Sequence, residues 1–351
     1  MRPIDLAQRA DPEAIAATLA PWLDDLEARV DVADEERLLA DWQRFAGGGW
    51  PDEIFSPVRA RAVPARISWP DIRLDDALDD PRLMVLAQLR SCSDVLAAGG
   101  GALLCVRANY GTGILPSLFG VEVVKMDRER DTLPGTRPLG RPALEALATA
   151  GPPGLERGLW PLVRSVGAAF TACVRGRPGL ERHLHAYHPD LQGPMDVLEM
   201  VWGTDCFTAF VEEPELVHAV LRTITATYVA VLADWDAVVL DRHPGWCAHW
   251  GLLHRGHIML RDDSAMNLSP RMFRELCAPY DGELLRRLGG GAMHACGRVG
   301  HFLADATALP GLHAFNFGQP DLNDPAVIQR ATVDRGVAIV GLGRAACGRM
   351  Q

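Results

Sequence analysis

Apolar and polar positions follow two rhythms along this chain. Apolar residues three or four positions apart predict helices at 12–30, 33–45, 81–98, 142–150, 155–174, 196–202, 214–233, 270–288, 299–308 and 324–334. Short apolar runs between them predict strands at 102–107, 182–188, 257–261, 292–296, 313–317 and 337–341. Helices that alternate with short strands indicate a parallel sheet joined by right-handed crossovers.

The same pattern divides the chain into two parts. Residues 1–80 are predicted to be an N-terminal helical extension followed by an arm, because 51–80 is rich in Pro and Asp and lacks periodicity. Residues 81–351 are predicted to form one α/β domain. We favour a single (β/α)8 barrel over an open sheet, since no Gly-x-Gly-x-x-Gly follows the first strand and polar residues end several different strands.

The stretch 257–297 carries the densest local signals. Ser269 is a helix N-cap, Pro270 is a first-turn residue, and a glycine run at 289–291 ends the helix. The following strand, 292–296, alternates faces, so His294 and Cys296 point to the same side. Imidazole nitrogen and thiolate sulphur are zinc ligands, and a third ligand from another strand would leave one position open for catalysis. The alternative is a buried histidine beside a buried structural cysteine.

Further polar residues follow other strands and are candidates for substrate contact. Each also has a structural explanation as a turn or a helix cap. The candidates are Arg107, Asn109, Tyr110, His188, Asp190, Gln192, Asp262 and Asp263. Adjacent strand residues face opposite ways, so we expect one of Asp262 and Asp263 to face the site. His249, His254 and His257 lie near Cys247, but their spacing fits no metal site, so we interpret them as surface or core histidines.

Composition narrows the possible partners. The chain has 351 residues, 48% of them hydrophobic, and a net charge of −10, and it lacks the basic stripe that a nucleic acid would require. No uninterrupted apolar run approaches the length of a membrane span, and no signal-peptide pattern follows Met1, so we expect a cytoplasmic protein without a membrane partner. The eight cysteines lack a pairing pattern, which favours free thiols. The sequence leaves the oligomeric state open.

Several phrases together resemble the uroporphyrinogen decarboxylase superfamily. They are HPDLQGPMDVLEMVWG at 188–203, RDDSAMNLSPRMFRELCAPY at 261–280, MHACG at 293–297, NFGQPDL at 316–322 and AIVGLG at 338–343. The resemblance covers about 80–345 and implies a (β/α)8 barrel. It also implies a further helix and strand beyond this region, so we expect a shortened, rearranged or truncated C-terminal segment.

The zinc-dependent, corrinoid-linked methyltransferase branch fits these residues better than the decarboxylase branch. In that branch His-x-Cys and a later Cys hold zinc, which implies His294, Cys296 and Cys347 as ligands. The zinc presents a thiol to a methyl-corrinoid, so the resemblance implies a cobalamin co-substrate, free or on a small corrinoid protein. In this interpretation Asp263 and Tyr110 are catalytic, and Arg107, Asn109, Asp190 and Gln192 bind the small-molecule substrate.

Two alternatives stay open. A porphyrinogen decarboxylase needs no cofactor but uses an N-terminal arginine signature that this chain lacks. The nearest arginines, Arg59, Arg61, Arg66 and Arg73, have neither its spacing nor its glycine context. The second alternative is a non-catalytic barrel that binds a corrinoid protein.

Overall fold

A four-stranded parallel sheet forms the centre of the C-terminal half of this computed structural model, which describes residues 2–50, 54–239 and 243–342. Its order is β11-β10-β9-β8, and its strands are β8 (Ile258–Arg261), β9 (Gly291–Ala295), β10 (Leu312–Phe317) and β11 (Ala338–Ile339). A second parallel pair joins β2 (Cys105–Val106) to β5 (His185–Ala186). The predicted strands are present, although several are shorter than the apolar runs that indicated them.

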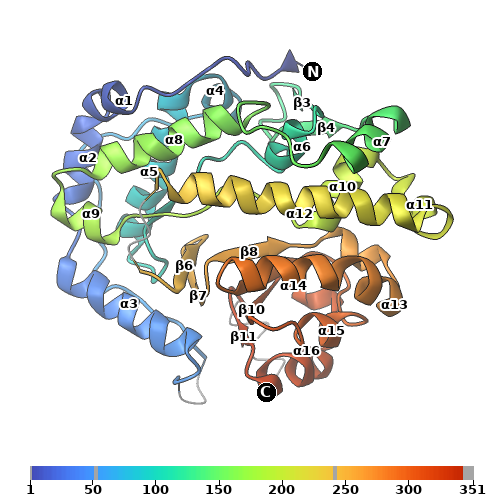
Figure 1. The fold of residues 1–351 in the computed structure, drawn as a ribbon. Helices are drawn as coiled ribbons and strands as arrows, with labels where there is room; N and C mark the ends of the chain where they lie inside the picture. Colours follow the sequence, from blue (N-terminus) through green and yellow to red (C-terminus); the bar gives the residue numbers. More distant parts are fainter. Residues whose placement is uncertain (1, 51–53, 240–242, 343–351) are drawn as a thin grey trace.

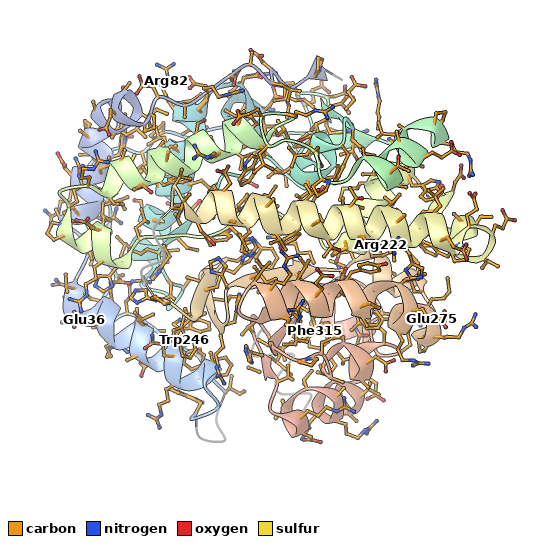
Figure 2. All side chains as sticks on the ribbon, in the orientation of Figure 1. Glu36, Arg82, Arg222, Trp246, Glu275 and Phe315 are labelled. Carbon is orange, nitrogen blue, oxygen red and sulfur yellow. The ribbon has the colours of Figure 1, made fainter. Side chains whose placement is uncertain are left out.

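The two faces of the four-stranded sheet have different surroundings. On one face Met259, Ala292, Ala314 and Val340 form a small cluster against Leu252. The opposite face contributes Leu260, Met293 and Phe315 to the main core. Phe315, labelled in Figure 2, lies in the interior, while Glu36, Arg82 and Glu275 lie at the outer surface. The period-two alternation of side chains along each strand produces this division.

Helices cover the core side of the sheet. In Figure 1, α8 (Trp160–Val174), α12 (Pro214–Asp236) and α14 (Ala278–Arg287) lie one below another, and α12 packs against both of its neighbours. The shorter helices α15 (Leu303–Ala306) and α16 (Pro325–Ala331) follow β9 and β10. Helices α5 (Pro81–Ala98), α7 (Arg141–Ala150) and α10 (Pro194–Trp202) complete the set that the periodicity predicted.

Two predicted helices are interrupted. The helix predicted at 12–30 is two, α1 (Pro12–Thr18) and α2 (Ala20–Glu27), because the backbone leaves helical geometry at Leu19. The helix predicted at 270–288 begins as α13 (Pro270–Met272) and passes through a π-helical turn at Phe273–Cys277 before α14. Pro279 has no N–H to continue an α-helical ladder, which explains the wider turn before it. Helix α3 (Val32–Ala46) agrees with the prediction, and α4 (Leu74–Asp79) lies in the segment predicted to be an arm.

An antiparallel hairpin was not predicted. It consists of β6 (Trp246–His249) and β7 (Leu252–Arg255), and its turn residues Trp250 and Gly251 have φ of +54° and +77°. Positive φ at both positions is the signature of a two-residue type I′ turn. Also unpredicted are β1 (Arg2–Pro3), β3 (Glu122–Lys125), β4 (Gly135–Arg137), α6 (Ile114–Leu118), α9 (Pro178–His183) and α11 (Cys206–Glu212).

The architecture is therefore α/β with parallel sheets. Within the described ranges the parallel strands fall into two separate sheets, so closure into the expected eight-stranded barrel is not shown. By length and composition helix α12 is apolar enough to cross a membrane, although it is not an uninterrupted apolar run. Most of its apolar window is buried in the core, as in core helices of globular domains.

Candidate active site

Three side chains that could hold a metal ion meet at the carboxyl-terminal edge of the four-stranded sheet. They are Asp263, His294 and Cys296, here called the edge triad, and one ligand atom from each lies within 4.8 Å of the others. The exposed fraction of the side chain is 44% for Asp263 and 13% for His294. The edge triad is therefore reachable from solvent but partly shielded from it.

The spacing of the edge triad is close to that of a zinc site. Cys296 Sγ lies 3.4 Å from His294 Nε2, and Asp263 Oδ1 lies 3.8 Å from the same nitrogen. In a tetrahedral site with Zn–S and Zn–N bonds of about 2.3 and 2.0 Å, sulphur and nitrogen ligands are about 3.5 Å apart. The His–Cys pair fits this distance, and the Asp263 oxygen is a few tenths of an ångström farther from His294 Nε2 than in an ideal tetrahedral site.

His294 is oriented by an asparagine on the neighbouring strand. His294 Nδ1 donates to Asn316 Oδ1 at 2.6 Å, and Asn316 Nδ2 donates to the carbonyl of Val340 at 2.7 Å. The bond to Val340 fixes the orientation of the Asn316 amide, so its oxygen faces His294. The proton of His294 therefore lies on Nδ1, and the lone pair of Nε2 points toward Cys296 and Asp263. Gly341 permits this approach, because a Cβ there would lie 2.5 Å from Asn316 Nδ2.

Asp263 is held by contacts on both sides. Its Oδ1 accepts a hydrogen bond from the backbone N–H of Cys296 at 2.7 Å. The Asp196 carboxylate of α10 accepts the N–H groups of Asp263 and Ser264 at 3.1 and 2.7 Å, and the Ser264 hydroxyl donates to Glu199. These bonds anchor the 263–264 turn to α10 and aim the Asp263 side chain at β9.

Cys296 is a neutral thiol without a metal. Burial, assisted by the negative charge of Asp263, raises the pKa of Cys296 to about 11. Gly318 leaves room for the sulphur, because a Cβ at 318 would lie 2.6 Å from Cys296 Sγ. Deprotonation of this thiol at neutral pH therefore requires a nearby cation such as a metal ion.

Asp262 faces away from the edge triad and meets Asp281 of α14. Both carboxyls are buried, and no described donor bonds to either of them. They contact each other, and burial raises the pKa of Asp281 to about 7 and that of Asp262 well above its ordinary value. The pair therefore shares a proton at neutral pH, which avoids two adjacent buried charges.

A cavity of about 680 Å³ adjoins Asp263. Its wall combines residues from β4, α10 and the loops around them, including Thr112, Thr136, Gln192, Glu199, Trp202 and Asp205. Gln192 and Asp263 are the sequence candidates that line this cavity. The volume is sufficient for a small-molecule substrate beside the edge triad.

Arg107, Asp190 and Arg261 form a charged cluster at the ends of β2, β5 and β8. Asp190 Oδ1 forms an ion pair with Arg261 Nη2 at 2.5 Å and accepts a hydrogen bond from Arg107 Nη1. Above them Trp250, at the hairpin turn, places its ring 5.0 Å from Arg261 Cζ and 5.2 Å from the His294 ring. The hairpin thus connects the charged cluster to the edge triad.

A second group of possible metal ligands, His188, Cys247 and His249, is fully internal and is here called the interior triad. His188 Nε2 accepts the N–H of Met259 at 3.0 Å, and its Nδ1 donates to the Pro189 carbonyl at 2.9 Å. His249 Nε2 accepts from Arg261 Nη2 at 2.7 Å. Burial, with a further contribution from Arg261, holds the pKa of both imidazoles well below the ordinary value.

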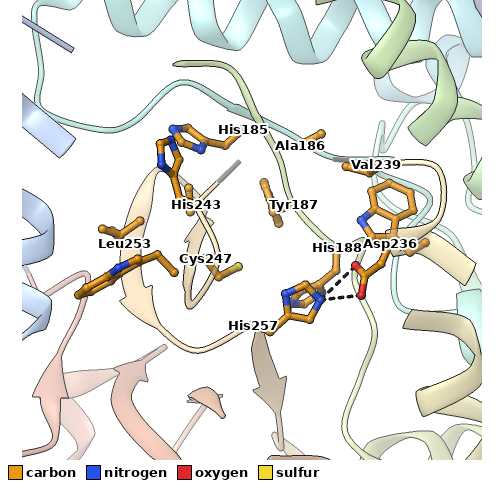
Figure 3. Close-up of a pocket in the computed structure, with 13 residues that line it drawn as sticks. His185, Ala186, Tyr187, His188, Asp236, Val239, His243, Cys247, Leu253 and His257 are labelled. Carbon is orange, nitrogen blue, oxygen red and sulfur yellow. Dashed lines mark hydrogen bonds and ion pairs between the residues drawn. The ribbon is translucent and has the colours of Figure 1, made fainter. Parts of the chain in front are cut away.

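His188 and Cys247 of the interior triad line a small pocket of about 50 Å³, shown in Figure 3, which runs along β5 and reaches the amino-terminal end of β8. His185, His243, Cys247 and His257 surround it, and His257 Nε2 bonds to Asp236 at 2.9 Å. This pocket is at the opposite end of the strands from the edge triad.

The other sequence candidates lie apart from the edge triad. Tyr110 is part of the apolar core, and burial raises its pKa. Asn109 Oδ1 is buried and accepts no bond from the described residues. His254 is buried and His257 is partly exposed. Cys347 lies outside the described residues, so its predicted role as a ligand stays a prediction.

Four residues of the site were not singled out from the sequence: Asn316, Trp250, Arg261 and Asp196. Strand alternation could have identified Asn316 and Arg261, because both pair in register with His294. No sequence pattern identified Trp250, because the segment around it predicted no strand and its histidines were interpreted as surface or core residues.

Comparisons with known proteins show a similar fold in a solved structure. No family model matches the chain, and no curated protein matches it in sequence. Among solved structures, a methyltransferase from Methanosarcina mazei is similar with a TM-score of 0.58 and 17% sequence identity. The match covers 87% of this chain and 82% of that protein. At this identity the likeness concerns the fold alone.

Proposed function

We propose that this protein is a zinc-dependent methyltransferase with a (β/α)8-type fold, which moves a methyl group between a corrinoid and a thiol acceptor. The observation that carries the proposal is the edge triad, with its nitrogen, sulphur and oxygen donors at a strand end. The fold likeness to a methyltransferase supports it at the level of architecture.

The donor set fits zinc by chemistry and by distance. Asp263, His294 and Cys296 would occupy three positions of a tetrahedral site, and the fourth would admit the acceptor. Asp263 here takes the third position that the resemblance gave to Cys347, and the catalytic role first predicted for it becomes that of a ligand. Zinc held by these residues would lower the pKa of an acceptor thiol and leave its sulphur nucleophilic.

The chain's own residues prepare that position. Asn316 fixes the tautomer and the direction of His294. Asp196 and Glu199 hold the turn that presents Asp263. The adjoining cavity offers space for the second reactant beside the acceptor.

The decarboxylase alternative has less support. Arg59 forms a buried ion pair with Glu35 at 2.6 Å, and Arg66 donates to the Ala28 carbonyl at 3.0 Å. Arg59 is thus engaged in a buried structural contact, and Arg66 is held at the surface by a backbone carbonyl.

Metal content and methyl transfer test the proposal together. Purified protein, loaded with zinc and dialysed, is expected to retain about one zinc per chain by elemental analysis. It is then expected to demethylate methylcobalamin in the presence of a thiol, followed by the corrinoid absorption spectrum. His294→Ala should lose both properties, while the control His301→Ala, at an exposed position, should keep both.

Absence of stoichiometric zinc in the unmodified protein would contradict the proposal. Zinc retention without transfer, combined with tight binding of a corrinoid protein, would instead support the non-catalytic alternative. Conversion of a porphyrinogen by metal-free protein would favour the decarboxylase.

A further inference from the structure

The charged cluster beside the edge triad has a surplus of positive charge. Arg107 and Arg261 both form ion pairs with the same oxygen of Asp190. The side chain of Arg261 is 4% exposed and that of Arg107 is 16% exposed. Two guanidinium groups therefore face one carboxylate in a region largely shielded from water, where an unbalanced charge is costly.

Arg261 also has unused hydrogen-bond donors. Its Nη2 donates to His249 Nε2 and forms an ion pair with Asp190, but Nε and Nη1 have no acceptor within the described ranges. A guanidinium carries N–H bonds on all three nitrogens and never loses its charge. A buried donor without a partner costs about 1–3 kcal/mol, more for a charged group. These donors therefore mark a place where an acceptor is missing from the chain itself.

The neighbouring imidazoles do not balance this charge. His249 accepts from Arg261 as a neutral ring, and His188 is engaged by Met259 and Pro189. The Trp250 ring covers Arg261 at 5.0 Å through a cation–π contact, which stabilises the cation but accepts no N–H bond in the plane of the guanidinium.

The missing acceptor would lie close to the edge triad. Arg261 and His294 are register partners on the adjacent strands β8 and β9, so their Cα atoms are about 4.8 Å apart. The Trp250 ring contacts both side chains. One small molecule could therefore reach the edge triad with one end and Arg261 with the other.

We propose that Arg261 and Arg107 form a subsite for one carboxylate of the small molecule that binds at the edge triad. The inference rests on the proposed function for the identity of the other end, a thiol. A single negative charge balances two arginines and one aspartate, which favours a carboxylate over a phosphate dianion. Trp250, 36% exposed, forms the solvent side of this subsite.

The test compares an acid with the amide of the same shape. Calorimetric titration of zinc-loaded protein uses 3-mercaptopropionate and 3-mercaptopropionamide. We expect the acid to bind at least about tenfold tighter, because hydrogen bonds to charged groups contribute about 1.5–3 kcal/mol. Arg261→Gln should remove the preference, and Arg107→Gln should reduce it. The control Arg271→Gln, an exposed arginine on α13, should retain it.

A metal-free arm separates this inference from the proposed function. Metal-free protein is titrated with propionate, propionamide and inorganic phosphate. A preference for propionate that Arg261→Gln abolishes supports the subsite even if the protein holds no zinc. Equal binding of acid and amide, in both arms, overturns the subsite and leaves the metal site untouched. Tighter binding of phosphate than of propionate overturns the assignment to a carboxylate. If Arg261→Gln does not fold, Arg107→Gln decides between these outcomes.

Discussion

The edge triad and the interior triad contain nearly the same residue types, yet their surroundings give them opposite properties. The edge triad includes a carboxylate, its histidine presents a lone pair, and it is partly exposed. The interior triad lacks a carboxylate, its histidines accept from Met259 and Arg261, and it is fully buried. Proximity of histidine and cysteine is therefore a weak criterion for a metal site, and the direction of the lone pairs and the local charge decide it.

Replacing the cysteine of each triad gives the largest expected contrast. Cys296→Ala should lower zinc affinity by more than about 100-fold, since it removes a direct ligand, whereas outer contacts typically account for 10–100-fold. Cys247→Ala should leave zinc affinity unchanged. Competition with a chromogenic chelator measures both. Equal losses in the two variants would contradict the distinction between the triads.

The interior triad should matter for stability instead. His188→Ala leaves the N–H of Met259 buried without an acceptor and opens a cavity, so we expect unfolding free energy to fall by about 3 kcal/mol. Urea denaturation measures this change. His301→Ala is the matched surface control, with an expected change within about 0.5 kcal/mol. A stable His188→Ala protein that binds less zinc would reverse the assignment of the two regions.

Asn316 should affect metal binding without being a ligand. Asn316→Ala frees the ring of His294 and is expected to lower zinc affinity by about 10–100-fold. Asn267→Ala, at an exposed position, serves as the control. If zinc affinity is unchanged in Asn316→Ala, the orientation of His294 does not depend on this hydrogen bond.

Acidification should lower the unfolding free energy through His249 of the interior triad, and this is the smallest of the expected effects. The pKa of His249 is lowered in the folded state, so below pH 6.5 the unfolded chain binds a proton that the folded chain excludes. Unfolding free energy should therefore fall as pH falls from 6.5. His249→Gln should reduce this dependence by up to about 1.4 kcal/mol per pH unit. Urea denaturation at several pH values measures the slope, and an unchanged slope would show that His249 titrates normally.

The sequence predicted the parallel elements well and the irregular ones poorly. Strands β8, β9 and β10 are short, mainly apolar runs, so their composition and length identify them. The hairpin β6–β7 contains His and Trp at positions where alternation is hard to see, and its turn has Trp250 where Asn or Gly is usual. The break at Leu19 depends on tertiary packing, which periodicity does not report.

For the candidate site, the sequence identified individual residues better than it identified the contacts between them. His294 and Cys296 follow from strand alternation. The ligand position of Asp263 depends on how α10 holds the 263–264 turn, and this is a tertiary contact. The contrast between Asp262 and Asp263 likewise depends on α14, which supplies Asp281.

The register between β8 and β9 has a consequence for selectivity by length. Because Arg261 and His294 are register partners on adjacent strands, the sheet fixes the separation of their backbones. The distance between the proposed carboxylate subsite and the edge triad therefore depends mainly on the two strands. In a series of thiol acids of increasing chain length, one member should therefore fit best. A chain that is one methylene too short or too long should bind less tightly by about 1–3 kcal/mol.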